Sequence, residues 1–169
     1  MTEIRLLKST DTHDFFQHRL EGLQLVSSAF GGSYEDELKQ GSARYEEILQ
    51  KQETNNVIFG AFTNGILIGC VGIYQETSSK ALHKAFIWGM YVKASSRGHG
   101  IGKKLMLQAI AHAKTIALVE LINLSSEANN VASKSLYLSL GFTIWGVEPK
   151  AIYENGKYYD EDHMILTLS

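Results

Sequence analysis

The spacing of apolar residues changes several times along the chain, and each change predicts a new element. Apolar positions alternate over residues 4–8, which predicts a short first strand. Residues 9–11 are typical helix caps, and the apolar residues of 15–26 that follow recur at helical spacing. A Glu-rich stretch over 34–53 then predicts one or two surface helices, with an interruption near Gly41.

The middle of the chain carries the strongest strand pattern. Two apolar runs, 57–62 and 66–74, flank Thr63-Asn64-Gly65, which is a strong hairpin signal. Side chains over 86–92 alternate with a period of two, and this predicts a third long strand that ends at Lys93. These three strands are expected to form the centre of a sheet.

The C-terminal half alternates between helical and strand patterns. Helices are predicted over 101–117 and 130–140, and strands over 118–126, 142–147 and 164–168. Asn155-Gly156 is the predicted turn between the last two strands, and Pro149 is expected to break or bulge the first of them. The predicted order is βααβββαβαββ, a mixed α/β fold. A single domain over 1–169 is expected because no repeat or linker-like segment interrupts the chain.

Composition narrows the class of protein. The 169 residues are 44% apolar and 20% charged, which is typical of one soluble globular domain. With 16 basic and 18 acidic residues, the net charge of −2 argues against a protein that binds nucleic acid through a broadly basic face. The longest apolar runs, such as 66–73, are far shorter than the roughly 18–20 residues of a membrane span. No membrane span or secretory signal is visible, so we expect a cytoplasmic protein.

Neither disulfide nor metal chemistry is indicated. The lone Cys70 has no partner for an internal disulfide and lies in an apolar run, so it is expected to be a buried core residue. The six histidines lack the spacing of a zinc site, and no metal site is predicted.

The most informative segment runs from Arg97 to Lys104, where Arg-Gly-His-Gly-Ile-Gly-Lys-Lys separates a predicted strand from a predicted helix. Glycines allow backbone N–H groups to converge, and the helix N-terminus adds unpaired donors and the positive end of a dipole. Residues 93–119 also contain five Lys or Arg residues and no acidic residue. This pattern favours a phosphate ligand, although on its own it is equally typical of a glycine-rich turn without a ligand.

Two common phosphate-binding motifs do not fit this segment. The dinucleotide fingerprint needs glycine at position 103, which is a lysine here. The P-loop needs Ser or Thr at position 104 and Gly at position 97, and these are lysine and arginine. The motif that remains is Arg-x-x-Gly-x-Gly.

A second motif, Asn-Val-Ala-Ser-Lys-Ser-Leu-Tyr-Leu-Ser-Leu-Gly-Phe, spans Asn130 to Phe142. Asn130 and Tyr137 are separated by nearly two helical turns, so both project from one face of the predicted helix. By itself Tyr137 would be interpreted as a packing residue. Together with the glycine loop, however, the segment resembles the GNAT superfamily of N-acetyltransferases. In that family Arg/Gln-x-x-Gly-x-Gly/Ala opens a helix, and Asn-x-x-Ala/Ser-x-x-Leu-Tyr-x-x-Leu-Gly-Phe follows a further strand.

The resemblance implies a mainly antiparallel central sheet flanked by helices, with acetyl-CoA as the co-substrate. It implies that residues 97–102 wrap the pyrophosphate and that the pantetheine arm pairs with 90–92. It places Tyr137 near the thioester sulfur as the general acid. The expected cofactor-binding residues are Met90, Tyr91, Val92, Arg97, Gly98, His99, Gly100, Ile101, Gly102, Lys103 and Asn130. For Lys103, an exposed basic helix face is an equally good interpretation.

The sequence leaves the amine acceptor and the general base open. The resemblance implies a primary amine of a small molecule, peptide or protein, and it makes a homodimer reasonable. Acceptor specificity is expected from 30–53 and from 153–163. The second segment has four acidic residues and one lysine, which would favour a cationic amine, although a solvated hairpin with packing aromatic residues is an equally good interpretation. The candidate bases are Glu127, Ser125, Glu35 and Glu37. The alternative function is a non-catalytic acyl-CoA sensor or partner-binding module.

Overall fold

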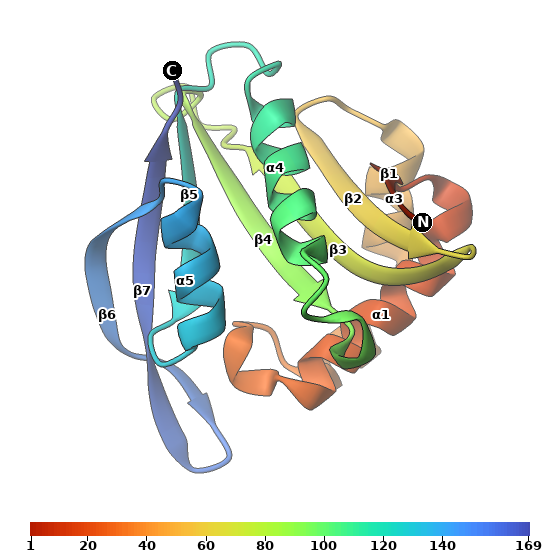
Figure 1. Ribbon diagram of the computed structural model, residues 1–169, viewed down its shortest axis with the longest axis horizontal. Coiled ribbons are helices and arrows are strands. Elements are labelled where there is room, and N and C mark those ends of the chain that lie inside the picture. The colour runs from red at the N-terminus through yellow and green to blue at the C-terminus, as the bar shows by residue number, and fades with distance from the viewer.

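The computed structural model describes residues 1–169 and shows one seven-stranded sheet with helices on both faces (Figure 1). The strand order is β1-β2-β3-β4-β5-β7-β6, and β4 and β5 are the only parallel pair. The strands are β1 (Thr2–Leu6), β2 (Asn56–Thr63), β3 (Ile66–Gln75), β4 (Lys84–Val92), β5 (Leu121–Glu127), β6 (Thr143–Glu154) and β7 (Lys157–Thr167). The helices are α1 (Thr12–Leu25), α2 (Tyr34–Gln40), α3 (Ala43–Lys51), α4 (Ile101–Ala113) and α5 (Val131–Ser139). Short 3-10 turns are η1 (Ser9–Asp11), η2 (Ser27–Ala29) and η3 (Ala94–Ser96). The predicted mixed α/β fold is confirmed.

Each face of the sheet has its own hydrophobic core. Helices α4 and α5 cover one face, which is the near face in Figure 1, and α1 and α3 cover the other. Val57 and Phe59 join the first core with Leu105 of α4, whereas Ile58 joins the second core with Phe15 of α1. Because alternate side chains of a strand point to opposite faces, a strand that is covered on both faces becomes an unbroken apolar run. No helix combines the length and the apolarity that a membrane crossing requires.

The predicted burial of Cys70 is confirmed. The side chain is 2% exposed in the second core, and this burial raises the pKa of the thiol to about 12. The thiol therefore stays protonated at ordinary pH, as a structural cysteine does.

The region 34–53 forms two helices, α2 and α3, which agrees with the predicted interruption near Gly41. Gly41 has a φ of +71°, in the left-handed region that favours glycine. The predicted element order, however, counted only one helix here. Three helices therefore precede β2, and the observed order is βαααβββαβαββ. Glu37 does not lie on a solvated face, because it is 4% exposed and accepts hydrogen bonds from Arg44 at 2.9 and 2.8 Å and from the Tyr45 hydroxyl. A buried carboxylate needs such partners, and here they tie α2 to α3.

The strand predicted from residue 118 begins at Leu121. Leu118 has a φ of +70° and lies exposed in the turn before the strand. The amides of Glu120 and Leu121 both donate to the carbonyl of His83, at 2.8 and 3.0 Å, and this contact starts the parallel pairing with β4. An exposed leucine before a strand cannot be distinguished by pattern from the first residue of that strand.

The closing hairpin is longer than predicted. Strands β6 and β7 pair as far as Glu154 and Lys157, around the predicted turn at Asn155-Gly156. The expected bulge at Pro149 is confirmed, because the register shifts between Glu148 and Ile152. The tip of the hairpin has little buried side-chain area on either face, so its sequence shows no apolar alternation.

Strands β4 and β5 pair over a short segment and then separate. Lys84–Phe86 pairs with Leu121–Asn123, after which β5 continues along β7 to its end. The pairing of β4 with β3 also shifts register before Tyr91, and Gly89 in this bulge has a φ of +64°. The sheet therefore opens between β4 and β5 beside helix α5, as Figure 1 shows.

Candidate active site

A cavity of about 370 Å³ lies where β4 has separated from β5, and it brings the two sequence motifs together. All the predicted site residues line it except His99, whose side chain is exposed on the loop. The lining residues are Val26, Ala29, Phe30, Met90, Tyr91, Val92, Ser96, Arg97, Gly98, Gly100, Ile101, Gly102, Lys103, Asn130, Ala132, Ser133, Leu136 and Tyr137.

The loop before α4 presents a row of unpaired backbone donors. None of the amides of residues 98–103 donates to a protein acceptor, and the first amide after them, that of Lys104, donates to the carbonyl of Gly100 at 3.1 Å. Gly98 and Gly100 have φ values of +79° and +73°, which give the loop its curvature. Consecutive free amides at the positive end of a helix form an anion site.

Close packing of α4 against β4 depends on Gly102. A Cβ atom there would approach the Cε of Met90 to 3.0 Å and the Cδ2 of Leu136 to 3.4 Å. The absent side chain lets the free amides lie directly above the end of β4. The cavity therefore runs from the loop amides along β4.

The charged side chains that line the cavity are basic. Arg97 and Lys103 are the charged residues of its lining, and no Asp or Glu contributes. The Nε of Arg97 donates to the Val92 carbonyl at 2.9 Å, and its guanidinium lies 5.7 Å from the centre of the Tyr91 ring. Lys104 is exposed and lies outside the lining.

The end of β4 presents backbone groups to the cavity. The amide of Lys93 donates to the carbonyl of Ile68 in β3 at 2.9 Å. Because successive residues of a regular strand turn their backbone groups to opposite sides, those of Val92 point away from β3, whereas Met90 lies in the bulge, where the pairing with β3 is interrupted. Tyr91 differs: its hydroxyl donates to Glu21 of α1 at 3.0 Å, so its side chain holds β4 against α1.

Asn130 and Tyr137 also meet at the cavity, but not as two positions of one helix. Asn130 is the residue before α5, and its Oδ1 accepts from the amide of Ser133 at 3.1 Å, which leaves Nδ2 to donate elsewhere. Tyr137 lies in α5, is 7% exposed and packs its ring edge-on against Phe142. Burial raises the pKa of the Tyr137 hydroxyl to about 12, although the nearby Ser133 opposes this shift.

A second, smaller cavity of about 60 Å³ adjoins the first and lies within the opening of the sheet. The residues that line both cavities are Ala29, Phe30, Met90, Asn130, Ser133 and Tyr137. The walls of the second are completed by Ile87, Trp88, Gly89, Leu124, Ser125, Ser126 and Glu127. Of the four candidate bases, Ser125 and Glu127 lie here, whereas Glu35 and Glu37 do not.

Comparison with known proteins fits this geometry. A sequence model of the acetyltransferase (GNAT) family matches residues 23–142. The chain belongs to the GNAT family. The family expectation drawn from the two motifs is thereby confirmed.

Similar proteins support the family and the fold. A mycothiol acetyltransferase of Thermobispora bispora is 30% identical over 124 residues, which cover 69% of this chain but only 41% of that relative. The structure of a GNAT acetyltransferase from Streptococcus pneumoniae has a TM-score of 0.89 at 24% identity and covers 99% of this chain and 100% of its own. The yncA protein of Salmonella typhimurium, solved with its cofactor acetyl-CoA, has a TM-score of 0.84 at 21% identity. That match covers 100% of this chain and 95% of the yncA chain.

Some residues of this GNAT site were missed by sequence reasoning. Val26, Ala29 and Phe30 come from the turn after α1, which the fold brings across to the cavity. Ala132 and Leu136 of α5 are apolar residues at helical spacing, which is typical of a core, yet they line the cavity wall. Apolar residues of a binding cavity and of a core have the same composition, so no signal in one sequence separates them.

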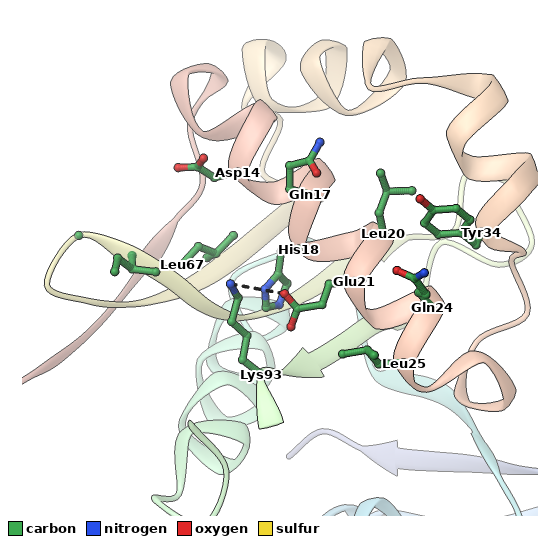
Figure 2. A pocket seen from close by; sticks show the side chains of 12 residues that line it. Asp14, Gln17, His18, Leu20, Glu21, Gln24, Leu25, Tyr34, Leu67 and Lys93 are labelled. Atoms are coloured by element: carbon green, nitrogen blue, oxygen red, sulfur yellow. Dashed lines mark ion pairs between the residues drawn. The ribbon is translucent and has the colours of Figure 1, made fainter. Parts of the chain in front are cut away.

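A larger cavity of about 510 Å³ lies elsewhere, between α1 and the tip of the β2–β3 hairpin, and Figure 2 shows it. None of the predicted site residues lines it. Its charged side chains are partly neutralised by an ion pair between Lys93 and Glu21 at 3.5 Å. His18 closes its floor, with Nε2 3.3 Å from the Tyr91 carbonyl, and burial lowers the pKa of this imidazole to about 4. The GNAT motifs and the free loop amides therefore assign the chemistry to the other two cavities.

Proposed function

We propose that this protein is an N-acetyltransferase that transfers the acetyl group of acetyl-CoA directly to a primary amine. The observation that carries the proposal is the row of free amides at 98–103, which leads through the larger site cavity to the hydroxyl of Tyr137. Acetyl-CoA bound to a similar fold in Salmonella typhimurium supports the same co-substrate here.

The cavity offers a separate partner for each part of the cofactor. The free amides of 98–103, with Arg97 and Lys103 beside them, would hold the pyrophosphate. The carbonyl of Met90 and the amide of Val92 would pair with the amides of the pantetheine arm, as an added strand pairs with a sheet edge, and this leaves the Met90 amide free. Asn130 would donate its free Nδ2 to the same arm. The thioester would then reach the smaller cavity.

Chemistry would take place where the two cavities meet. The amine nitrogen attacks the acetyl carbon, and the backbone amide of Met90 stabilises the oxyanion that forms. Collapse of this intermediate breaks the C–S bond, and the sulfur leaves as a thiolate that accepts the proton of Tyr137. Because burial raises the pKa of Tyr137 to about 12, its hydroxyl stays protonated over the usual assay range and can donate a hydrogen bond to the leaving sulfur.

The acceptor would enter from the side of Ser125 and Glu127. Glu127 is the acidic residue in the smaller cavity, and it would attract a cationic amine. The two segments expected to set specificity also meet: a further cavity of about 250 Å³ is lined by Ser33, Tyr34 and Glu35 on one side and Glu154 and Asn155 on the other. This arrangement supports an acceptor site between α2 and the β6–β7 hairpin.

A substitution at Tyr137 tests the proposal. Calorimetry measures CoA binding, and release of free thiol from acetyl-CoA measures transfer to spermidine, 2-phenylethylamine, L-methionine and a peptide with N-terminal alanine. Tyr137→Phe should lower kcat about 10- to 100-fold, because a positioned acid commonly contributes at least this much. The affinity for CoA should change less than about twofold, since the ring and its packing remain.

The outcomes separate the candidate functions. CoA binding without transfer to any of the four amines would favour the non-catalytic sensor. Equal kcat in Tyr137→Phe and wild type would remove this tyrosine from the chemistry but leave the acetyltransferase in place. Absence of CoA binding would contradict the whole proposal.

A further inference from the structure

A hydrogen-bonded chain of three side chains leads from the smaller cavity to the protein surface. The Oγ of Ser125 lies 3.0 Å from Nδ1 of His163, and Nε2 of His163 lies 2.9 Å from Oε2 of Glu148. Ser125 lines the cavity, His163 is partly buried and Glu148 is exposed. The chain therefore joins the acceptor side of the site to solvent.

The sheet itself creates this alignment. Ser125 of β5 stands directly opposite His163 of β7, and His163 stands opposite Gly146 of β6. The register of β6 shifts just before Gly146, so Trp145 leaves the regular pairing and its ring lies 5.4 Å from the imidazole. The three polar residues thus come from three adjacent strands, on rigid elements rather than on loops.

The donor and acceptor properties of the three side chains determine the direction of the hydrogen bonds between them. A carboxylate only accepts, so Nε2 of His163 donates its proton to Glu148 and Nδ1 is left as the acceptor. The hydroxyl of Ser125 can then donate to Nδ1 while its lone pairs remain open toward the cavity. A neutral imidazole held in this way is a proton acceptor one hydroxyl removed from the acceptor amine.

Acidic side chains of two strands lie around His163. Glu148 faces it from β6, and Glu161 lies two residues before it on β7, opposite Glu127 of β5. Burial and the neighbouring Glu148 raise the pKa of Glu161, while the proximity of His163 opposes this. The nearby lysine of α5, Lys134, is paired with Asp162 at 2.7 Å.

We infer that Ser125, His163 and Glu148 form the proton relay that deprotonates the acceptor amine. This inference rests on the proposed acetyl transfer and names the base that the sequence left open. The acceptor enters as an ammonium ion, one of whose N–H bonds breaks as the proton passes to Ser125 Oγ, while the proton of Ser125 moves to Nδ1 of His163. The lone pair freed on the nitrogen then forms the C–N bond, and loss of the second N–H proton balances the proton that Tyr137 gives to the leaving thiolate. The resulting imidazolium is stabilised by Glu148 and returns its proton to solvent. Ser125 is the catalytic residue of the relay, and His163 and Glu148 act through it.

The pH dependence of transfer distinguishes a relay from a structural role. His163→Gln should lower kcat/KM for the best of the four amines about 10- to 100-fold near neutral pH. The deficit should shrink toward about pH 10, because a primary amine then loses its proton without help. Ser125→Ala, which removes only a hydroxyl, should show the same pattern, and Glu148→Gln a smaller one. His13→Gln is the matched control, since His13 is exposed on α1 and lines neither site cavity.

The result that overturns the relay is distinguishable from failure of the proposed function. If wild type transfers acetyl groups but His163→Gln and Ser125→Ala keep its profile, or lose activity equally at every pH, the relay is wrong and the acetyltransferase remains. If wild type transfers to none of the four amines, the relay falls together with the proposed function. CoA binding in every variant, measured by calorimetry, shows that the variants are folded.

Discussion

Replacing Gly100 by alanine tests whether the loop before α4 is shaped for a ligand. Gly100 has a φ of +73°, and a Cβ atom added there meets no atom within 4 Å, so the substitution changes only the cost of the backbone conformation. That cost is about 1–2 kcal/mol for a residue other than glycine. Because the amides of 98–103 make no hydrogen bond within the protein, the hydrogen bonds that would fix the orientation of these amides come from a ligand. We expect the free loop of the variant to relax into another conformation, so that CoA must restore the bound one at this cost. Since about 1.4 kcal/mol corresponds to a tenfold change in affinity, the affinity for CoA should be 5- to 30-fold weaker.

Gly65→Ala is the matched control for this experiment. Gly65 has a φ of +77°, and its Cβ would also meet nothing within 4 Å, but it lies in the tight turn between β2 and β3. In this turn the paired strands hold residue 65 at a positive φ. The energetic cost of that φ for alanine should therefore reduce the stability of the fold and lower the melting temperature by about 2–8 °C. CoA affinity, measured by calorimetry, should equal that of wild type. Equal CoA affinities of Gly100→Ala and Gly65→Ala would refute the reasoning about the loop.

Two further predictions concern buried charge. The pKa of His18 is about 4 in the folded protein and near 6.5 in the unfolded chain, so the unfolded state takes up its proton first as the pH falls. Between pH 6.5 and 4, wild type should therefore lose about 3 kcal/mol more unfolding free energy than His18→Gln, measured by urea denaturation; parallel curves would contradict this. Glu37→Ala should lower the unfolding free energy by about 3 kcal/mol, because it leaves the nearly buried Arg19, 3.8 Å away, without its anion. Glu47→Ala, at an exposed pair on α3, should leave the unfolding free energy nearly unchanged, and a similar loss in both variants would show that burial is not the cause.

The parts of the fold that sequence predicts well are those with one unambiguous period. The run 57–62 and its Asn64-Gly65 turn predict the β2–β3 hairpin because the turn demands positive φ values, and both residues have them. The hairpin of β6 and β7 was predicted at its base but not along its length. Its tip is exposed on both faces, so no periodic signal exists there.

The residues of the candidate site also fall into two groups, those that a single sequence predicts and those that it does not. The loop that presents free amides can be recognised in the sequence by its glycines. Gly98 and Gly100 are needed for positive φ values, and Gly102 is needed for close packing. Contacts between side chains on different strands produce no such pattern in the sequence. Ser125 and His163 are 38 residues apart and meet only through the register of β5 and β7, which a single sequence does not contain.

The opening between β4 and β5 can serve a ligand because it does not weaken the sheet. Strand β5 loses β4 after Asn123 but keeps β7 along its length, and β4 keeps β3, so each strand stays paired on one side. Only the backbone groups that face the opening lack partners, and such a group costs about 1–3 kcal/mol when it is buried without water or a ligand to satisfy it. A ligand with amide and phosphate groups satisfies these donors and acceptors as it displaces water. It therefore gains affinity from backbone groups that the fold leaves unpaired, and an apolar cavity of equal volume would provide none of this affinity.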